Sequence, residues 1–354
     1  MNTPATTCSW AARSFLLYNE AVKLGVKFLF EAPGQQLVRN TANGRVEAVI
    51  VKAKEGYKRV NAKKGVILAT GDIGGSPEML AAYAPIALKA NGSQYTPVGV
   101  NTGDGHKMGM WVGGAIEDTP FPTMIHPQAF SWLNYSSLFV NQLGQRYMNE
   151  DTWVQAKSIQ AMHQPGKGAY CFSIIDSNWP TTVAKTIPYG GGMFWDNFRA
   201  YGQKWTPDGD KATIAGYLKE GEVAWQADTI EELAAKIDVP ADALKESVKR
   251  YNELAKDKKD TDFGKRAELL YPIETGPFIA FKFGGALLGV AGGLLVDEDM
   301  RVLDKDKNVI NGLYAVGNVS GGLYGVDYPI AVPGNSHGRA LTWGYLAGRK
   351  AARA

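Results

Sequence analysis

Residues 312–354 read GLYAVGNVSGGLYGVDYPIAVPGNSHGRALTWGYLAGRKAARA, and this glycine-rich end of the chain decides the fold. A short apolar run at 313–316 predicts a buried strand that leads into loops dense in glycine. The tripeptide GNS at 334–336 then opens a helix that runs to the C-terminus. Free backbone amides at a helix start carry partial positive charge, which suits a phosphate or another electron-rich group. A strand, glycine turns and a helix in that order predict an α/β fold.

Two earlier glycine clusters follow the same logic. Residues 66–75, VILATGDIGG, form a strand-like run that ends at Gly71, where a backbone without Cβ turns sharply and approaches a ligand closely. Residues 101–114, NTGDGHKMGMWVGG, place Asp104 at the N-cap position of a helix. Its carboxylate either caps that helix or accepts hydroxyl groups of a ribose or ribityl chain. The sequence contains no dinucleotide fingerprint of the form GxGxxG followed by an acid about 20 residues later.

Composition and charge exclude several classes of function. The chain has 354 residues, 41 of them glycine, and a formal net charge of +3, which gives no basic surface for nucleic acid. No apolar run is long enough to span a membrane and no leader pattern is seen, so the sequence predicts a cytoplasmic protein. Two cysteines and four histidines, none at metal-ligand spacing, predict no metal site.

The N-terminal third predicts a helix and several strands. Apolar spacing predicts a helix over 10–24 that ends at Gly25, and alternation predicts a strand over 26–31. Three further strand-like runs, separated by turn dipeptides, follow at 45–53, 57–62 and 64–70.

The middle of the chain has a different texture. Tryptophans cluster between about 121 and 288, and a capping box at Thr229 opens a predicted helical pair over 229–257. The chain length also favours two domains. We therefore predict an inserted α+β domain over 121–288, between the two parts of a first domain at 1–120 and 289–354.

Several strings, taken in order, resemble the flavoprotein family of fumarate reductase and succinate dehydrogenase, which also includes 3-ketosteroid dehydrogenases and bacterial enone and enoate reductases. They are VILATGDIGG, NTGDGHKMG, LFVNQLGQRYMNED, TIEELAAKI through KDTDFGK, GGLLVDEDMRVL, and GLYAVGNVSGG with GNSHGRALTWGYLAG. The match covers nearly the whole chain. It implies a flavin-binding Rossmann-like domain, FAD as the cofactor, and a capping domain that closes over the isoalloxazine ring.

The resemblance assigns the FAD contacts by position. They are Ala69, Thr70, Gly71, Asp104, Asn318, Gly334, Ser336 and His337. Asn318 stands where the family usually has Glu, and its amide can still hydrogen-bond a hydroxyl. The family's first βαβ unit, with its GxGxxG turn, normally precedes the point where this chain begins. The resemblance therefore implies the C-terminal part of such an enzyme, with that unit supplied by a longer chain or by a separate N-terminal FAD-binding polypeptide.

Positions that hold two carboxylates in fumarate reductases differ here. The segment 151–155 lacks the arginine that donates a proton in that group, and Gly289-Val290 replaces the family's His-Thr. The loop YGVDYPIAVPG is instead similar to the Tyr-Pro-Gly stretch of ketosteroid dehydrogenases, where a tyrosine hydroxyl polarises the ketone. Tyr328 is then the donor to a carbonyl oxygen that becomes enolate-like as hydride arrives. The alternative is that Tyr328 is only a packed aromatic residue of the loop.

The leading hypothesis is an FAD-dependent oxidoreductase that transfers hydride between flavin N5 and a carbon–carbon bond next to a carbonyl. We expect Tyr135 or Tyr147 to exchange the α proton, and His126 matches a family His-Pro, although a lone histidine is more often structural. Aromatic residues in the capping domain favour a flat substrate that is apolar or phenolic. The sequence does not reveal the electron donor or the direction of the reaction.

Two other functions remain open. One is a non-catalytic fragment, or half of a split flavoprotein, that acts as an interaction module. The other is a dicarboxylate reductase with relocated arginines, for which the candidates are Arg146, Arg199 and Arg339.

Overall fold

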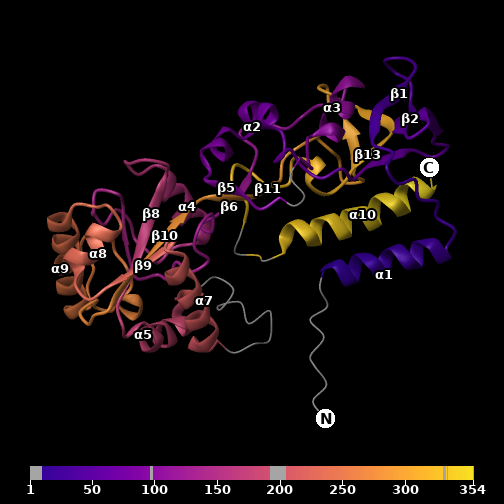
Figure 1. Ribbon diagram of the computed structural model, residues 1–354. Helices are drawn as coiled ribbons and strands as arrows, with labels where there is room; N and C mark the ends of the chain where they lie inside the picture. The colour runs from indigo at the N-terminus through magenta and orange to yellow at the C-terminus, as the bar shows by residue number, and fades with distance from the viewer. Residues whose placement is uncertain (1–9, 96–98, 192–204, 330–331, 333, 354) are drawn as a thin grey trace, which may run out of the picture.

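The computed structural model describes residues 10–95, 99–191, 205–329, 332 and 334–353. It is a mixed α/β molecule, as predicted, and Figure 1 shows two units joined through β5, β6 and β11. The strands are β1 Gly34–Arg39, β2 Val46–Ala53, β3 Gly56–Asn61, β4 Val66–Leu68, β5 Gly92–Ser93, β6 Thr123–His126, β7 Leu138–Val140, β8 Tyr170–Ile175, β9 Ala224–Ala227, β10 Phe278–Gly284, β11 Ala286–Val290, β12 Arg301–Leu303 and β13 Val309–Ala315. The α-helices are α1 Trp10–Lys23, α2 Pro77–Tyr83, α3 Asp104–Trp111, α4 Val154–Met162, α5 Trp179–Thr186, α7 Pro207–Glu220, α8 Ile230–Lys236, α9 Ala241–Lys256 and α10 Asn335–Arg353.

The first unit, called here the four-stranded unit, is built on the antiparallel sheet β7-β8-β10-β9 with α5, α7, α8 and α9. Side chains alternate along β10, so Phe278 and Ala280 pack with α8 and α9 while Ile279 and Phe281 pack with α5 and α7. On α9, Leu244, Val248 and Tyr251 recur at helical spacing and face the same core. Both faces of the sheet are therefore covered by helices of the unit itself.

The second unit, called here the three-sheet unit, holds the sheets β1-β2-β3, β5-β11-β6 and β12-β13-β4. β4 runs parallel to β13 and is the outer strand of its sheet. A core that includes Leu68, Met108 and Leu313 joins this sheet to α3 and to the β1-β2 pair. The division of the chain at 121 and 288 stays a prediction.

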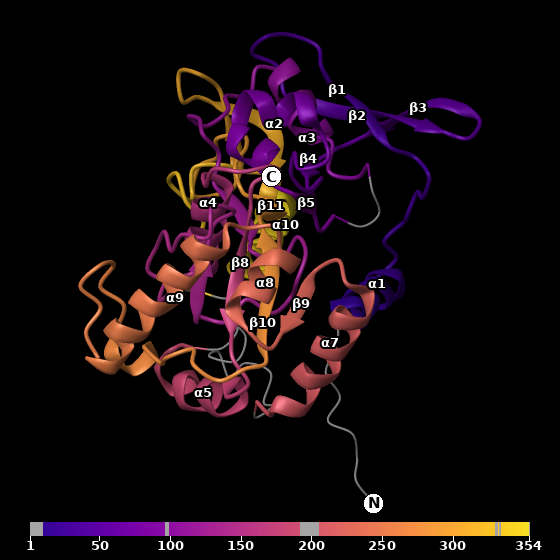
Figure 2. The same ribbon diagram turned by 60° about the vertical axis from the view of Figure 1, so that its left-hand side comes forward.

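Most of the N-terminal elements agree with the sequence. The helix before Gly25 and the three strand-like runs are confirmed as α1, β2, β3 and β4. The strand predicted over 26–31 is wrong, because this segment forms no sheet and its aromatic residues pack on α1 instead. Phe28 lies 4.7 Å from Tyr18 between ring centroids, and Phe28 stacks on Phe30 at 5.9 Å. Figure 2 shows the β2-β3 hairpin projecting from the unit.

The helical pair is also confirmed. Thr229 caps α8 and its side chain accepts the amide of Glu232 at 3.2 Å, while Pro240 is the N-cap of α9. Within the described residues, no helix is both long enough and apolar enough to cross a membrane.

Two helices of the three-sheet unit leave apolar side chains uncovered. No described residue between 14 and 36 is buried, and Leu24 at the end of α1 is 83% exposed. On α10, Leu341 is 52% exposed and Tyr345 is 63% exposed, one helical turn apart. This unit therefore carries a large apolar surface that its own described residues do not cover.

Candidate functional site

The candidate site lies where β4 and β13 end. The two strands are parallel, and the amide of Val316 donates to the carbonyl of Leu68 at 2.9 Å, so the chain leaves both strands side by side. In open α/β sheets, ligands bind outside the carboxyl ends of the strands. Ala69 and Thr70 follow β4 and are exposed at this edge, and Asn318 follows β13. The structure thus brings together predicted residues from two distant motifs.

The start of α3 lies against the turn after β4. A Cβ at Gly105 would collide with the hydroxyl of Thr70, so helix and turn touch. Asp104 is the first residue of α3, and the N-cap is Gly103 with a φ of +74°. The prediction that Asp104 is the cap is therefore wrong by one position, because the left-handed backbone there suits glycine. The exposed carboxylate of Asp104 accepts the hydroxyl of Thr102 at 2.9 Å.

The start of α10 reaches the same edge. The hydroxyl of Ser336 donates to Oδ1 of Asn318 at 3.0 Å, and the backbone amide of Ser336 donates to the hydroxyl oxygen of Tyr328 at 2.7 Å. Gly334, with a φ of +73°, makes the turn into the helix, and His337 is exposed. Asn318, Ser336 and Tyr328 thus form one hydrogen-bonded group.

Tyr328 is 5% exposed, and its ring meets that of Tyr324 edge-on with 5.3 Å between centroids. Burial raises the pKa of Tyr328, so the phenol is protonated at neutral pH. Its oxygen accepts the amide of Ser336, and among the described residues nothing accepts its proton. The Tyr328 hydroxyl is thus a donor that has no acceptor among the residues that the structure describes.

His126 ends β6 and is 6% exposed. Burial lowers the pKa of His126 to about 4, so the ring is neutral at pH 7. The adjacent Ile125 donates its amide to Oε1 of Gln155 at 3.0 Å, and Nε2 of Gln155 donates to the side chain of Asp327. Gln155 on α4 therefore ties β6 to the loop that carries Tyr328, a link that sequence reasoning did not assign.

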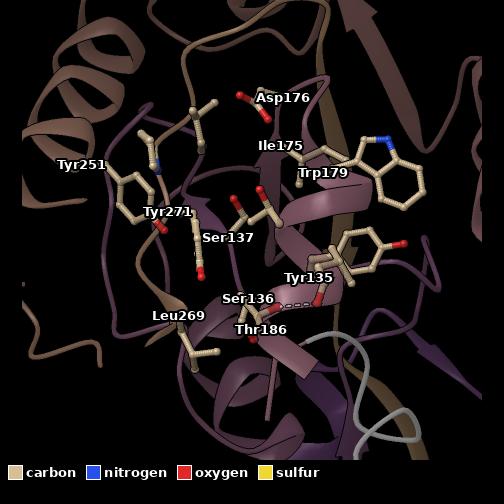
Figure 3. Close-up of a pocket in the computed structure, with 14 residues that line it drawn as sticks. Tyr135, Ser136, Ser137, Ile175, Asp176, Trp179, Thr186, Tyr251, Leu269 and Tyr271 are labelled. Carbon is tan, nitrogen blue, oxygen red and sulfur yellow. Dashed lines mark hydrogen bonds between the residues drawn. The ribbon is translucent and has the colours of Figure 1, made fainter. Parts of the chain in front are cut away.

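The other two tyrosines lie in the four-stranded unit and its surroundings. Tyr135 is 2% exposed and donates its hydroxyl to Asp210 of α7 at 2.6 Å. It borders, with Trp179, a cavity of about 20 Å³ that has room for about one water molecule (Figure 3). Tyr147 packs against Cys171, and burial raises its pKa. The structure does not bring either tyrosine to Tyr328, and their part in proton exchange stays a prediction.

Two of the three candidate arginines already have partners. Arg146 binds the carboxylates of Glu150 and Asp260 inside the four-stranded unit. Arg339 is buried and donates to the carbonyl of Gly317 at 2.6 Å. Arg199 lies outside the described residues. Arg146 is therefore engaged by two carboxylates, whereas Arg339 is 4% exposed and its Nε has no hydrogen-bond partner among the described residues.

Sequence reasoning also missed two buried carboxylates near the site. Asp72 is 2% exposed, and Glu117 accepts the amides of Gly293 at 2.8 Å and Gly322 at 2.7 Å. Burial raises the pKa of both carboxyl groups. The signal for Asp72 is present in the sequence, because a charged residue interrupts the apolar and glycine run VILATGDIGG.

These residues fit one side of FAD. Gly71, with a φ of +78°, leaves the backbone after β4 bare, and Asp104 offers acceptor oxygens to hydroxyl groups. The positive start of α10 at Ser336 suits an electron-rich ring edge. Across the described ranges, no three His, Cys, Asp or Glu side chains group as metal ligands.

Comparisons with known proteins support the same cofactor. The family model described as FAD binding domain matches residues 5–332. The chain is 29% identical over 348 residues to a fumarate reductase (cytochrome) of Shewanella frigidimarina, covering 96% of this chain and 54% of that protein. It is 29% identical over 360 residues to a vinyl phenol reductase of Lactiplantibacillus plantarum, covering 95% and 70%.

A solved structure agrees with these relatives. The crystal structure of a 3-ketosteroid delta1-dehydrogenase from Sterolibacterium denitrificans, in complex with 1,4-androstadiene-3,17-dione, matches with a TM-score of 0.71 at 27% identity, over 95% of this chain and 62% of that one. The chain thus spans 54% of the fumarate reductase and 62% of the dehydrogenase. Because the family model covers most of its length and the matching turns meet at one sheet edge, the chain belongs to the FAD binding domain family.

Proposed function

We propose that this chain forms part of an FAD-dependent oxidoreductase that acts on a carbon–carbon bond adjacent to a carbonyl group. Family membership supports the cofactor, and the relatives are named for reactions on vinyl phenol, fumarate and ketosteroids. FAD, when bound, supplies the hydride-transferring group. A reductase of dicarboxylates is less well supported, because Arg146 is paired with two carboxylates and Arg339 is buried.

The main support for this function is the hydrogen bonding of the Tyr328 hydroxyl. Its oxygen accepts the amide of Ser336 at the start of α10, and its proton has no acceptor among the described residues. An amide at the positive end of a helix draws electron density from the phenol oxygen, which makes the O–H a stronger donor. Such a donor stabilises a carbonyl oxygen more as that oxygen gains negative charge, and this difference lowers the barrier.

The surroundings of Tyr328 favour a flat substrate. Tyr324 lies edge-on to it, and Met124 and Ala291 complete a small apolar cluster. Gln155 on α4 donates to the neighbouring Asp327, so α4 holds the loop that carries Tyr328. Aromatic and apolar walls with one aligned donor suit a flat enone, either apolar or phenolic.

Tyr328→Phe tests the proposal in the FAD-loaded protein. Loss of this donor to the carbonyl should lower kcat by about 100-fold on an enone substrate. Tyr324→Phe is the matched control, because it removes a hydroxyl from the neighbouring ring and should change kcat by less than about threefold. Steady-state reduction of a panel of cyclic enones and phenolic enoates gives both values. Equal turnover in wild type and Tyr328→Phe would remove Tyr328 from the mechanism.

We also infer that a separate N-terminal FAD-binding polypeptide, or such a segment of a longer chain, completes the FAD site. Its support is the outer position of β4, with Ile67 36% exposed, together with the apolar surface of the same unit that includes Leu341 and Tyr345. An added parallel strand would pair with β4 and bring a glycine turn to the exposed Ala69 and Thr70. Retention of FAD after desalting, with and without that polypeptide, measures whether this chain holds the cofactor alone.

A further inference from the structure

Asp72 stands out among the buried polar groups because four donors converge on it. Its Oδ1 accepts the amide of Gly74 at 2.9 Å, and the hydroxyl of Tyr95 lies 2.7 Å from each carboxylate oxygen. Its Oδ2 accepts the amide of Val290 at 3.2 Å and Nδ2 of Asn318 at 3.3 Å. No Lys, Arg or His of the described residues forms an ion pair with it.

This donor set fixes how the side chain of Asn318 is turned. Backbone amides can only donate, so both oxygens of Asp72 act as acceptors and the carboxylate is the matching group. The amide nitrogen of Asn318 must then face Asp72, and its oxygen faces α10. There Oδ1 accepts the hydroxyl of Ser336 at 3.0 Å and Nη2 of Arg339 at 3.3 Å. A flipped amide would place its oxygen against Oδ2 of Asp72 and its nitrogen against Nη2 of Arg339, so two acceptors would meet on one side and two donors on the other.

The chain of contacts continues from Asn318 to the candidate catalytic hydroxyl. Ser336, held by its side chain on Asn318, donates its backbone amide to Tyr328 at 2.7 Å. Asp72 precedes all of these in sequence by more than two hundred residues, and the separation between Asp72 and Asn318 is 246. A single buried carboxylate after β4 thus reaches the first turn of α10 and the loop before it.

We propose that Asp72 is a positioning residue of the site: its carboxylate orients Asn318, and through Asn318 it holds the start of α10 and the hydroxyl of Tyr328. Burying a carboxylate that has no cation beside it is costly, so its four hydrogen bonds must offset that cost. Any hydrogen-bond acceptor could accept the amides of Gly74 and Val290. The hydrogen bond from Asn318 is the contact that connects the carboxylate to Ser336 and Tyr328. The effect on turnover rests on the proposed function of Tyr328, whereas the effect on α10 does not.

Hydrogen–deuterium exchange of this chain without FAD tests the link directly. Asp72→Ala should speed exchange in the peptide that contains Ser336 by about tenfold, because its hydrogen bond to Tyr328 opens more often. Tyr95→Phe is the matched control. It removes another donor to the same carboxylate and leaves Asn318 in place, so exchange at Ser336 should not change. Circular dichroism checks that each variant is folded.

Asn318→Ala covers the case in which Asp72→Ala does not fold. It cuts the same path one step later and should also speed exchange at Ser336 by about tenfold. Unchanged exchange at Ser336 in Asn318→Ala, or in a folded Asp72→Ala, would overturn the proposal. So would an equal increase in Tyr95→Phe, since that would mean general loosening around Asp72.

Turnover of the FAD-loaded protein separates this inference from the proposed function. If Asp72 acts through Tyr328, Asp72→Ala should lower kcat in the wild-type background by about tenfold and have no further effect in Tyr328→Phe. Independent, multiplying losses would contradict the path through Tyr328. If Tyr328→Phe itself leaves turnover unchanged, the proposed function fails, while the exchange result at Ser336 still decides the role of Asp72.

Discussion

The two units bury their apolar side chains in different ways. In the four-stranded unit, helices cover both faces of the sheet, and Leu138 and Phe172 are at most 2% exposed. In the three-sheet unit, no described residue from 14 to 36 is buried, and β4 pairs with a strand on one side only. A large apolar surface outside the core marks a contact site. The first unit therefore covers its core with its own helices, whereas the second leaves an apolar surface that its described residues do not cover.

The largest loss of stability is expected from a substitution inside the buried ion network of the four-stranded unit. Arg146 binds Glu150 at 2.9 Å and Asp260 at 2.7 Å, with all three side chains at most 7% exposed. Arg146→Met would leave two buried carboxylates with less compensation, which should lower the free energy of unfolding by about 3–5 kcal/mol. Urea unfolding followed by circular dichroism measures the change.

Arg250→Met is the control for that experiment. Arg250 pairs with Asp262 at 2.6 Å but is 46% exposed, so water and salt already screen the pair. We expect no measurable change in stability. A loss as small in Arg146→Met would mean that the buried ion network does not hold the four-stranded unit together.

In the three-sheet unit, acid should act through a buried histidine. His106 on α3 is fully buried, with Nε2 3.0 Å from the carbonyl of Gly292, and burial lowers its pKa to about 4. The unfolded chain binds this proton near pH 6.5, so the stabilisation is complete above pH 6.5 and is lost as pH falls toward 4. The two values differ by about 2.5 units, which corresponds to about 3 kcal/mol.

Denaturant unfolding at pH 7 and pH 4.5 measures this dependence. His106→Gln should flatten the loss of stability between the two pH values relative to wild type. His163→Gln is the control, because His163 is exposed at the end of α4. If both variants keep the wild-type slope, the burial of His106 does not contribute to acid sensitivity.

Much of the candidate site could be predicted because short glycine motifs carry local geometry. Gly71 and Gly334 adopt left-handed backbones that the sequence signals directly, and the strand–turn–helix order around them indicates which ends meet. Asp104 shows the limit of such reasoning, since the helix begins one residue earlier than a capping rule suggests. Short sequence motifs therefore predict the presence of a turn better than the residue at which the next helix begins.

What could not be predicted depends on contacts across the fold. The segment 26–31 alternates like a strand, but a strand needs a neighbour, and Phe28 and Phe30 pack on Tyr18 instead. Asp72 meets Asn318 only because parallel β4 and β13 place their ends together. Tyr135 looks suited to proton exchange by its position in sequence, yet its hydroxyl is turned to Asp210.

Substitutions on the exposed apolar surface of α10 should have the smallest effect on the free energy of unfolding. Leu341→Gln with Tyr345→Gln changes two side chains that are 52% and 63% exposed, so the free energy of unfolding should change by less than about 0.5 kcal/mol. If that surface binds the N-terminal FAD-binding polypeptide, the same change should weaken association by at least about tenfold, since two apolar contacts are lost. Titration of that polypeptide into the chain, followed by FAD fluorescence, gives the affinity.

Leu143→Gln provides the matched control in this titration, because Leu143 is 44% exposed but lies in the loop after β7. It should change neither stability nor association. A stability loss above about 1 kcal/mol in the α10 variant would mean that this face packs within the chain itself, since exposed positions away from such contacts rarely cost that much. Unchanged association would place the partner elsewhere on the three-sheet unit. The expected pattern, normal stability with weak association, is what distinguishes a contact surface from a core.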